Sequence, residues 1–375
     1  MTNPLFSNGG FNNFNINISP AFSQTMPPLS SIIAIGNPII DITAVIDKES
    51  IQKYGLKWGQ TTFMSPENEA FFNEIENKAE VSYTPGGSVQ NTLRVASWCL
   101  NMDPNNKNKN YKLTMLGSVG DDNYKNKVIN SLKIYGVNPL LQIIPNMHTS
   151  RCAVGVYQKE RCLVPDIKAS NFITENFISD NAQEILSHDA LIIEGYFLKE
   201  KFDLCKKMCE EFIKLKKLVI LTLCDAFMIE FHKEKILEIG NIADMIVGNF
   251  RAAEILADGR GNNMKETFEK IHKKLMNKDR LLVITAGCQG AFCSKFNYQK
   301  MQLEFILQDF PQLIKTSDIV DINGAGDAFF GGFLSQQMQG KRLMSCCKCG
   351  NEIANVILRN VGCTFPRDTK INFNY

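Results

Sequence analysis

The sequence predicts an α/β protein with a doubly wound, mostly parallel sheet, helices on both faces and a small β lid. Short apolar runs of about four to eight residues, typical of buried strands, alternate with longer amphipathic segments typical of helices. This alternation is the pattern of parallel βαβ units. The chain has 375 residues, of which 44% are hydrophobic, so it can form one large domain with an accessory piece or two ordinary domains.

Six apolar runs are predicted to be strands of the main sheet, and amphipathic segments between them are predicted to be helices. The strands are Ile32–Ile35, Thr114–Gly117, Ala190–Ile193, Leu218–Leu223, Met245–Val247 and Leu281–Thr285. The helices are Ser88–Leu100, Lys125–Ile134, Lys201–Leu215 and Met264–Met276. The amphipathic pattern gives each helix an apolar side that can cover the sheet.

Three further runs have no helix of suitable length between them, so we expect them to form a small second sheet. They are Ile42–Ile46, Leu140–Ile144 and Ala153–Tyr157. The predicted lid covers about residues 40–65 and 138–168 of a domain that spans residues 31–366. Residues 1–30 carry six Asn and no charge, which predicts a disordered tail or an arm whose Phe residues dock on a protein partner. Residues 367–375 are expected to form a C-terminal tail.

Charge and cysteine content exclude several classes of function. The 41 basic and 39 acidic residues give a net charge of +2, so no broad basic surface for nucleic acid is expected. No uncharged apolar run reaches the roughly 18 residues of a membrane span, and no positively charged secretory signal is recognisable. The 12 cysteines have no repeating spacing, which favours free thiols in the reducing cytoplasm. Cys346, Cys347 and Cys349 lack a second pair or a nearby His at zinc spacing, which favours a core or surface-helix role over a metal site.

The most informative stretch is Val320–Phe333, where a turn of small residues opens directly into an apolar helix. Gly324 and Gly326 permit a close approach that a Cβ would obstruct. With Ala325, their N–H groups would converge at the helix N-terminus and form an anion hole. Asp327 falls in the first turn and suits a base that takes a hydroxyl proton while backbone amides hold phosphate. The alternative is a glycine-softened helix start with Asp as its cap, since neither a Walker loop nor a dinucleotide fingerprint is present.

Asp321–Asp327 resembles the C-terminal signature of the PfkB, or ribokinase-like, kinase family. Other segments resemble the same family, and within it the branch that acts on adenosine. In family order they are Gly36–Ile42, Gly86–Asn91, Arg161–Asn171, Gly248–Asn249, Thr285–Gly287 and Gly362–Pro366. The resemblance runs from about Ile32 to Pro366 and implies a ribokinase-like fold.

The resemblance implies transfer of the ATP γ-phosphoryl group to the 5′-hydroxyl of adenosine, giving AMP and ADP. It implies Mg²⁺ as a cofactor and leaves open a K⁺ ion beside the Asp321–Asp327 turn. The catalytic residues that it implies are the base Asp327, the anion-hole residues Gly324, Ala325 and Gly326, and the phosphoryl-neutralising Arg161. The substrate-binding residues are Asn37, Asp41, Gly87, Ser88, Asn91, Cys152, Leu163, Ile167 and Phe197. The nucleotide-binding residues are Thr222, Asn249, Thr285, Gly287, Asn323 and Asn351, and Asn249 is also expected near the metal through water.

Several positions depart from the family pattern. Asn249–Ala252 lacks the Glu that the family carries at the fourth position to organise magnesium-bound water. Glu254 lies about 200° further round the helix and is a poor substitute. Ile322 stands where the signature commonly has Thr. The remaining departures are a bulkier, charged lid at Thr149–Cys152 and Asp166–Lys168, and Thr222 and Asn351 in place of Asn and His.

These departures keep two alternatives open. One is a catalytically weakened kinase-fold subunit with a binding or scaffold role in a larger assembly. The other is a ribokinase-like enzyme for another nucleoside or sugar.

Overall fold

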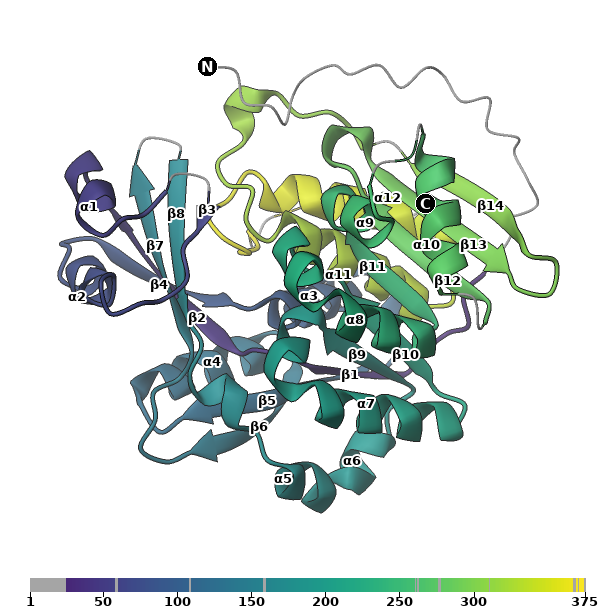
Figure 1. The fold of residues 1–375 in the computed structure, drawn as a ribbon, viewed down its shortest axis with the longest axis horizontal. Coiled ribbons are helices and arrows are strands. Elements are labelled where there is room, and N and C mark those ends of the chain that lie inside the picture. Colours follow the sequence, from purple (N-terminus) through teal and green to yellow (C-terminus); the bar gives the residue numbers. More distant parts are fainter. Residues whose placement is uncertain are drawn as a thin grey trace.

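The computed structural model describes residues 25–57, 60–107, 109–157, 160–259, 261, 263–275, 278–309, 311–366, 369 and 371–373. A nine-stranded sheet runs through the larger part of the molecule, and a five-stranded sheet stands at its side (Figure 1). The predicted α/β class, with a large mostly parallel sheet and a small second sheet, is therefore confirmed.

The large sheet has the strand order β14-β13-β12-β11-β10-β9-β1-β5-β6. From β12 to β6 all neighbouring strands are parallel, whereas β13 and β14 continue the sheet antiparallel at the other edge. The six runs predicted for this sheet fall on its strands. The strands are β1 (Ser31–Ile35), β5 (Lys112–Gly120), β6 (Val137–Ile144), β9 (Ala190–Glu194), β10 (Leu218–Thr222), β11 (Met245–Asn249), β12 (Arg280–Thr285), β13 (Ala291–Asn297) and β14 (Gln302–Asp309).

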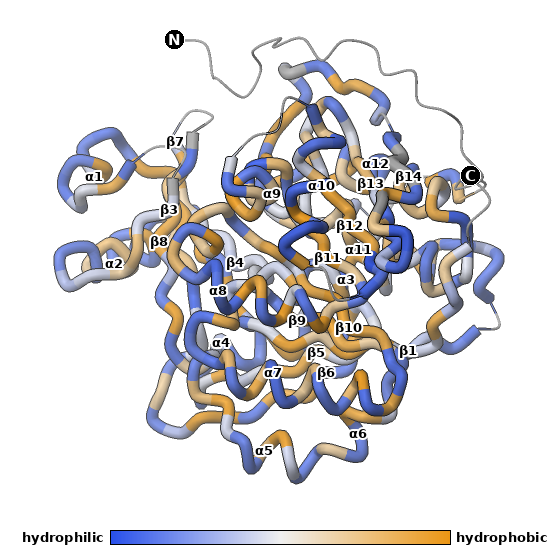
Figure 2. Tube along the Cα trace, turned by 45° about the vertical axis from the view of Figure 1, so that its right-hand side comes forward, coloured by the Kyte–Doolittle hydropathy of each residue, from blue (hydrophilic) through white to orange (hydrophobic). Residues whose placement is uncertain are grey.

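Helices cover both faces of this sheet. Because side chains alternate along a strand, Ile32 and Ala34 pack with α3, α4, α11 and α12, whereas Ile33 and Ile35 pack with α7 to α10. Apolar residues accordingly run through the central strands, while the outer helices alternate between polar and apolar residues (Figure 2). The helices are α3 (Ser88–Met102), α4 (Asn123–Ile134), α5 (Glu175–Asp180), α6 (Ala182–Leu186), α7 (Leu198–Lys214), α8 (Ala226–Ile242), α9 (Phe250–Leu256), α10 (Met264–Lys274), α11 (Ala325–Met338) and α12 (Leu343–Ile357).

The small sheet has the order β3-β8-β7-β2-β4 and is accompanied by α1 and α2. Two of the three runs predicted for it, Ile42–Ile46 and Ala153–Tyr157, fall on β2 and β7. The prediction for Leu140–Ile144 is wrong, because this run belongs to β6 and pairs in parallel with β5. Helix α4 connects β5 to β6, so the three elements form a βαβ crossover within the large sheet. The bounds are β2 (Ile39–Val45), β3 (Gln60–Thr61), β4 (Val81–Gly86), β7 (Arg151–Tyr157), β8 (Glu160–Asp166), α1 (Lys48–Lys53) and α2 (Ala70–Glu76).

The two predicted tails contribute residues to the domain. Most of residues 1–30 lies outside the described residues, but Thr25 forms a β-bridge with Arg342. Leu29 is buried and donates its N–H to the Met338 carbonyl. Phe373, within the predicted C-terminal tail, is buried in a cluster that includes Trp98. Residues 25–30 therefore belong to the domain rather than to the predicted N-terminal tail, and Phe373 of the C-terminal tail packs against the domain.

The cysteines and the helix lengths bear on two other predictions. All 12 cysteines are free, and Cys346, Cys347 and Cys349 are fully buried on α12, as a core role requires. Among the described residues, no helix combines the length and the apolarity that crossing a bilayer requires.

Candidate active site

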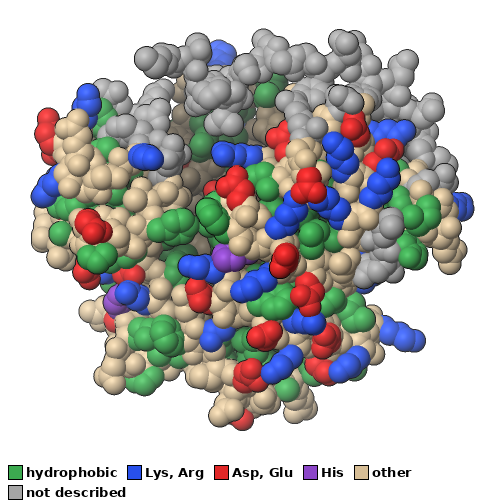
Figure 3. Space-filling view, viewed as in Figure 1, with side chains coloured by type: hydrophobic (Ala, Val, Ile, Leu, Met, Phe, Trp, Pro, Cys, Tyr) green, Lys and Arg blue, Asp and Glu red, His purple; other side chains and the backbone are tan. Residues whose placement is uncertain are grey.

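One cavity of about 1140 Å³ lies where the carboxyl ends of the parallel strands meet. The chain winds outward from β1 in both directions, towards β6 and towards β12, so the strand order reverses between β1 and β9. Ligands of open α/β sheets bind at such a switch point. Asn37 after β1 and Glu194 at the end of β9 both line the cavity, and β2 and β8 of the small sheet close its other side. The surface is hollowed between the small sheet and the main body (Figure 3).

Asp327 lies at the cavity wall in the first turn of α11. Ser88 Oγ donates to its Oδ1 at 2.8 Å, and Asn91 Nδ2 donates to its Oδ2 at 3.1 Å. Burial raises the pKa of Asp327, while these two hydrogen bonds lower it. Each carboxylate oxygen can accept more than one hydrogen bond, so both oxygens can still accept a bond from a substrate hydroxyl. The predicted base is thus held in a defined orientation.

In the glycine turn before α11, Gly324 packs closely against Cys363, whereas Gly326 has free space beside its Cα. Gly324 has a φ of 76°, and a Cβ on it would lie 2.9 Å from Cys363 Cβ, so this position requires glycine. A Cβ on Gly326 would meet no protein atom within 4 Å. Asp321 braces the turn by accepting from Asn323 N at 3.0 Å and Gly362 N at 2.6 Å. The open backbone at Gly326 fits the predicted anion hole.

Asp41, on β2, lies at the same cavity. A Cβ on Gly86 of the neighbouring strand would lie 2.3 Å from Asp41 Oδ1, so glycine leaves the space that this carboxylate occupies. Burial raises the pKa of Asp41 to about 7; Arg161 opposes the rise, and the charges of Asp321 and Asp327 add to it. At neutral pH this carboxyl group is therefore poised between its two protonation states.

Glu194 is a cavity residue that the sequence predictions missed. Its carboxylate accepts from Asn37 N at 3.1 Å and from Asn37 Nδ2 at 3.3 Å, while Asn37 Oδ1 is buried without a hydrogen-bond partner. Burial raises the pKa of Glu194 to about 8, opposed by the Asn37 hydrogen bonds. A Cβ on Gly36 would overlap this carboxylate, at 2.0 Å from Oε2. The sequence signal for Glu194 is an acidic residue at the end of an otherwise apolar strand.

The apolar wall of the cavity corresponds only in part to the predicted purine pocket. Phe197 is 1% exposed and belongs to the core cluster, so its prediction is wrong. Its neighbour Tyr196 lines the cavity instead, because both sit in a tight 3-10 turn that directs adjacent side chains apart. Tyr196 contacts Phe227, which contacts Phe63, with ring centroids 5.7 and 5.3 Å apart. The predicted residues that do line the cavity are Cys152, Leu163 and Ile167.

The predicted nucleotide residues divide into two groups. Gly287 and Asn351 are not among the residues that line the cavity. The Asn351 amide donates to Asp309 Oδ2 at 2.7 Å, which ties α12 to β14. The four predicted residues at the cavity are Thr222, Asn249, Thr285 and Asn323.

Helix α9 supplies no carboxylate to the cavity at the position where the family carries Glu. Ala252 is fully buried in the core cluster, and Glu254 lines a separate surface hollow beside Lys233. Asn249 Oδ1 accepts from Ala252 N at 2.8 Å and so caps this helix. Asp225, which follows β10, lines the cavity together with Asn249. Carboxylate and amide oxygens are ligands suited to Mg²⁺ that keeps several waters and binds substrate phosphates.

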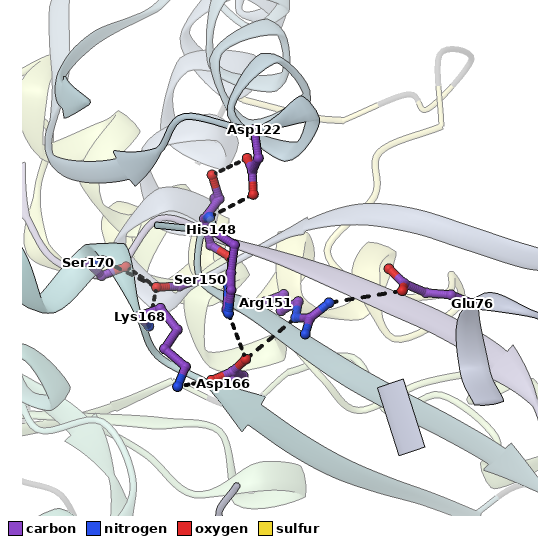
Figure 4. Close-up of polar contacts among 9 residues, drawn as sticks. Glu76, Asp122, His148, Ser150, Arg151, Asp166, Lys168 and Ser170 are labelled. Carbon is purple, nitrogen blue, oxygen red and sulfur yellow. Dashed lines mark hydrogen bonds and ion pairs between the residues drawn. The ribbon is translucent and has the colours of Figure 1, made fainter. Parts of the chain in front are cut away.

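The charged residues of the lid, which depart from the family pattern, compensate one another. Arg151 and Asp166 face each other in the register of β7 and β8, with Nε 3.5 Å from Oδ2. His148 and Lys168 also converge on Asp166, at 3.3 and 3.7 Å (Figure 4). The Asp166 side chain is 3% exposed, so its charge is neutralised within the protein. This cluster joins the base of the small sheet to the segment that precedes β7.

Arg161, on β8, forms an ion pair with Asp321, with Nη1 3.0 Å from Oδ2. It does not line the cavity in this conformation. The pair connects the small sheet directly to the turn that carries Gly324 and Gly326. Arg161, predicted to act on the transferring group, is therefore connected to the glycine turn through Asp321.

The chain matches known proteins along most of its length. The pfkB family of carbohydrate kinases matches residues 48–370. The chain is similar to adenosine kinase 2 of Arabidopsis thaliana, with 26% identity over 91% of this chain and 97% of that protein, and to adenosine kinase of Dictyostelium discoideum, with 28% identity over 91% and 98%. The fold resembles Anopheles gambiae adenosine kinase in complex with P1,P4-di(adenosine-5) tetraphosphate, with 27% identity, a TM-score of 0.78 and coverage of 89% of this chain and 98% of that one. Schistosoma mansoni adenosine kinase in complex with 2-fluoroadenosine, at 21% identity, shares the fold with a TM-score of 0.77, over 89% and 97% of the two chains.

Proposed function

Because the chain belongs to the pfkB family of carbohydrate kinases, we propose that it transfers the γ-phosphoryl group of ATP to the 5′-hydroxyl of adenosine. The observation that carries this proposal is the arrangement around Asp327. Its carboxylate is oriented by two side-chain donors and stands one residue from the open backbone of Gly326. A proton acceptor beside a phosphate-binding turn is what transfer to an alcohol requires.

In the proposed reaction, Asp327 takes the proton of the 5′-hydroxyl as that oxygen forms a bond to the γ-phosphorus. The bond from the γ-phosphorus to the β,γ-bridging oxygen breaks, and the electron pair leaves with ADP. Backbone N–H groups of the Gly324–Gly326 turn bind the negative charge, helped by the N-terminus of α11. Arg161, held beside this turn by its ion pair with Asp321, is the cation that would reach the transferring group.

The nucleoside would lie between the large sheet and the small sheet. The ionised Asp41 carboxylate suits the vicinal ribose hydroxyls, because two acceptor oxygens can meet two donors. The base would lie against the apolar wall that includes Leu163, Ile167 and Tyr196. Asn37 Oδ1, which is buried without a partner, offers an acceptor to a donor on the substrate.

Magnesium is expected to enter with the ATP phosphates. Asp225 and Asn249 are the cavity residues whose oxygens fit its water shell. When bound, the ion neutralises phosphate charge and orients the transferring group. Because Mg²⁺ in such a site keeps several waters and few protein ligands, the site tolerates the absence of the family's Glu at position 252.

Product analysis with a panel of acceptors tests this function. The purified protein is incubated with Mg²⁺, [γ-³²P]ATP and adenosine, inosine, guanosine or ribose. The proposal predicts labelled AMP and the highest kcat/KM with adenosine. Faster turnover of ribose or another nucleoside would support the second family activity instead. Adenosine binding without any transfer would support a binding or scaffold role.

A further inference from the structure

Arg94 is a buried cation in the second turn of α3, three residues after Asn91, which donates to the candidate base. Its side chain is among the largest fully buried ones, and the residue is 2% exposed. The guanidinium lies against the rings of Tyr135 and Phe365, at 4.9 and 5.0 Å from their centroids. Over the described part of the chain, no carboxylate lies within ion-pair distance of it, although the charge of Asp41 acts on it. A buried charge is costly without compensation, so the hydrogen bonds of the Arg94 guanidinium must stabilise it.

Those contacts lead to Asp327. Arg94 Nη1 donates to Asn91 Oδ1 at 3.1 Å and also to the Cys363 carbonyl at 3.4 Å. The Asn91 amide in turn donates from Nδ2 to Asp327 Oδ2 at 3.1 Å. A continuous series of hydrogen bonds therefore runs from a permanent cation, through one amide, to the carboxylate.

The cation also determines which way the amide points. An arginine can only donate, and a carboxylate can only accept. Only one orientation of the Asn91 amide satisfies both neighbours, with Oδ1 towards Arg94 and Nδ2 towards Asp327. The flipped amide would place two donors together on one side and two acceptors together on the other. Without Arg94 this constraint is lost.

The orientation of the Asn91 amide affects the protonation state of Asp327, because its hydrogen bond lowers the Asp327 pKa. Burial raises the pKa of Asp327 and so favours its protonated form, which cannot act as a base. The titratable groups that interact with Asp327 are Asp41 on β2, Glu194 on β9, Tyr196 after it, Cys224 after β10 and Cys363 beside the glycine turn. Burial raises the pKa of Tyr196, Cys224 and Cys363, which keeps them neutral, so only the carboxyl groups can repel Asp327, and Arg161 is already paired with Asp321.

We propose that Arg94 is a positioning residue for the base. It fixes the Asn91 amide so that this amide donates to Asp327, and thereby keeps Asp327 oriented and ionised. The role of Asp327 as a base rests on the proposed function, whereas its orientation and ionisation do not.

Carboxyl NMR tests the proposal without any substrate. The full chain is labelled with [4-¹³C]aspartate, the Asp327 signal is assigned by its loss in Asp327→Asn, and its pKa is followed by titration. Arg94→Met is expected to raise the Asp327 pKa by about one unit or more, whereas Arg94→Lys retains a cationic donor and should restore most of the difference. Arg280→Met is the matched control, since Arg280 is also 2% exposed and donates to the carbonyls of Ala243 and Asn241. It should leave the Asp327 pKa unchanged.

A double variant separates action through Asn91 from a direct effect of the charge. Asn91→Ala alone should raise the Asp327 pKa, and Arg94→Met should then add almost nothing. Additive shifts, or an unchanged pKa in folded Arg94→Met, would overturn the proposal. If Arg94→Met does not fold, Arg94→Leu replaces it, because Leu is also apolar, suits a helix and has no donor. The same rise is expected for Arg94→Leu, and an unchanged pKa there would contradict the proposal equally.

The pH profile of kcat at saturating adenosine is the second readout. If the Asp327 pKa rises, the acidic limb of the Arg94→Met profile should move to higher pH, and kcat should approach the wild-type value at alkaline pH. A purely structural loss would instead lower kcat equally at every pH. If the wild-type protein forms no AMP, the proposed function fails, but the NMR titration still decides the role of Arg94.

Discussion

Gly326→Ala should separate activity from stability at the glycine turn. The new methyl group would meet no protein atom within 4 Å, and alanine is the better helix former, so stability should stay level or rise by up to about 1 kcal/mol. The methyl would, however, occupy the space where phosphate must approach the backbone. A displacement of about 1 Å at a reacting centre can cost on the order of 100-fold in rate. We therefore expect kcat to fall by about 100-fold, which corresponds to roughly 2.7 kcal/mol.

Gly324→Ala provides the contrast. Its Cβ would lie 2.9 Å from Cys363 Cβ at a residue whose φ is 76°, so we expect a loss of about 1–2 kcal/mol of stability from the backbone conformation, with the steric contact in addition. Urea unfolding and steady-state kinetics of both variants, with adenosine affinity measured by calorimetry, form the assay. A Gly326→Ala protein with wild-type kcat would refute the placement of phosphate at this turn. The same placement would be refuted if the activity of Gly326→Ala fell only as much as its folded fraction did.

Three further results are expected. Because the pKa of Asp41 is about 7 and the ionised form accepts the ribose hydroxyls, KM for adenosine should rise as pH falls below about 7; Asp41→Asn should have a high KM that no longer varies over that range. Glu194 has a folded-state pKa of about 8 against 4.5 for the free group, so the folded protein keeps a proton that the unfolded chain loses, and stability falls as pH rises through that window. Glu194→Gln should therefore match the wild type in urea unfolding at pH 5 and exceed it at pH 9 by on the order of a few kcal/mol; equal stability at both pH values would contradict the burial argument. Arg151→Ala should cost about 1–3 kcal/mol, because it removes a cation that pairs with the buried Asp166. Asp166→Asn in the same background should cost less than it does alone, and additive losses would show that the two residues do not interact.

The fold was predictable from the sequence where burial is strongest. The six inner strands β1, β5, β9, β10, β11 and β12 appear as apolar runs, and the sequence predicts all six. The sequence does not predict β13, although it is largely buried, because polar Ser294 and Lys295 interrupt its apolar residues. The edge strand β6 was misassigned because it is only partly buried, so its run resembles those of the small sheet. Edge strands carry a weaker signal because one side lacks a neighbour.

The site was predictable where a motif carries it, and less so where side-chain direction decides. Asp327, Asp41 and the glycine turn follow from the motifs. The choice between Tyr196 and Phe197 depends on one residue in a tight turn, which periodicity does not resolve. Arg151 and Asp166 each look damaging in the sequence, since only the register of β7 and β8 places them opposite each other.

Phosphoryl transfer by Asp327→Asn tests the central claim most directly. This variant keeps the size of the side chain and removes its capacity to take a proton, and Ser88 and Asn91 remain to hold it. With Mg²⁺, [γ-³²P]ATP and adenosine, the wild type is predicted to form AMP and ADP in equal amounts, and Asp327→Asn is predicted to lose roughly 10²- to 10⁴-fold in kcat while still binding adenosine. Wild-type rates in Asp327→Asn, or no AMP from a folded wild-type protein that binds adenosine, would contradict the account.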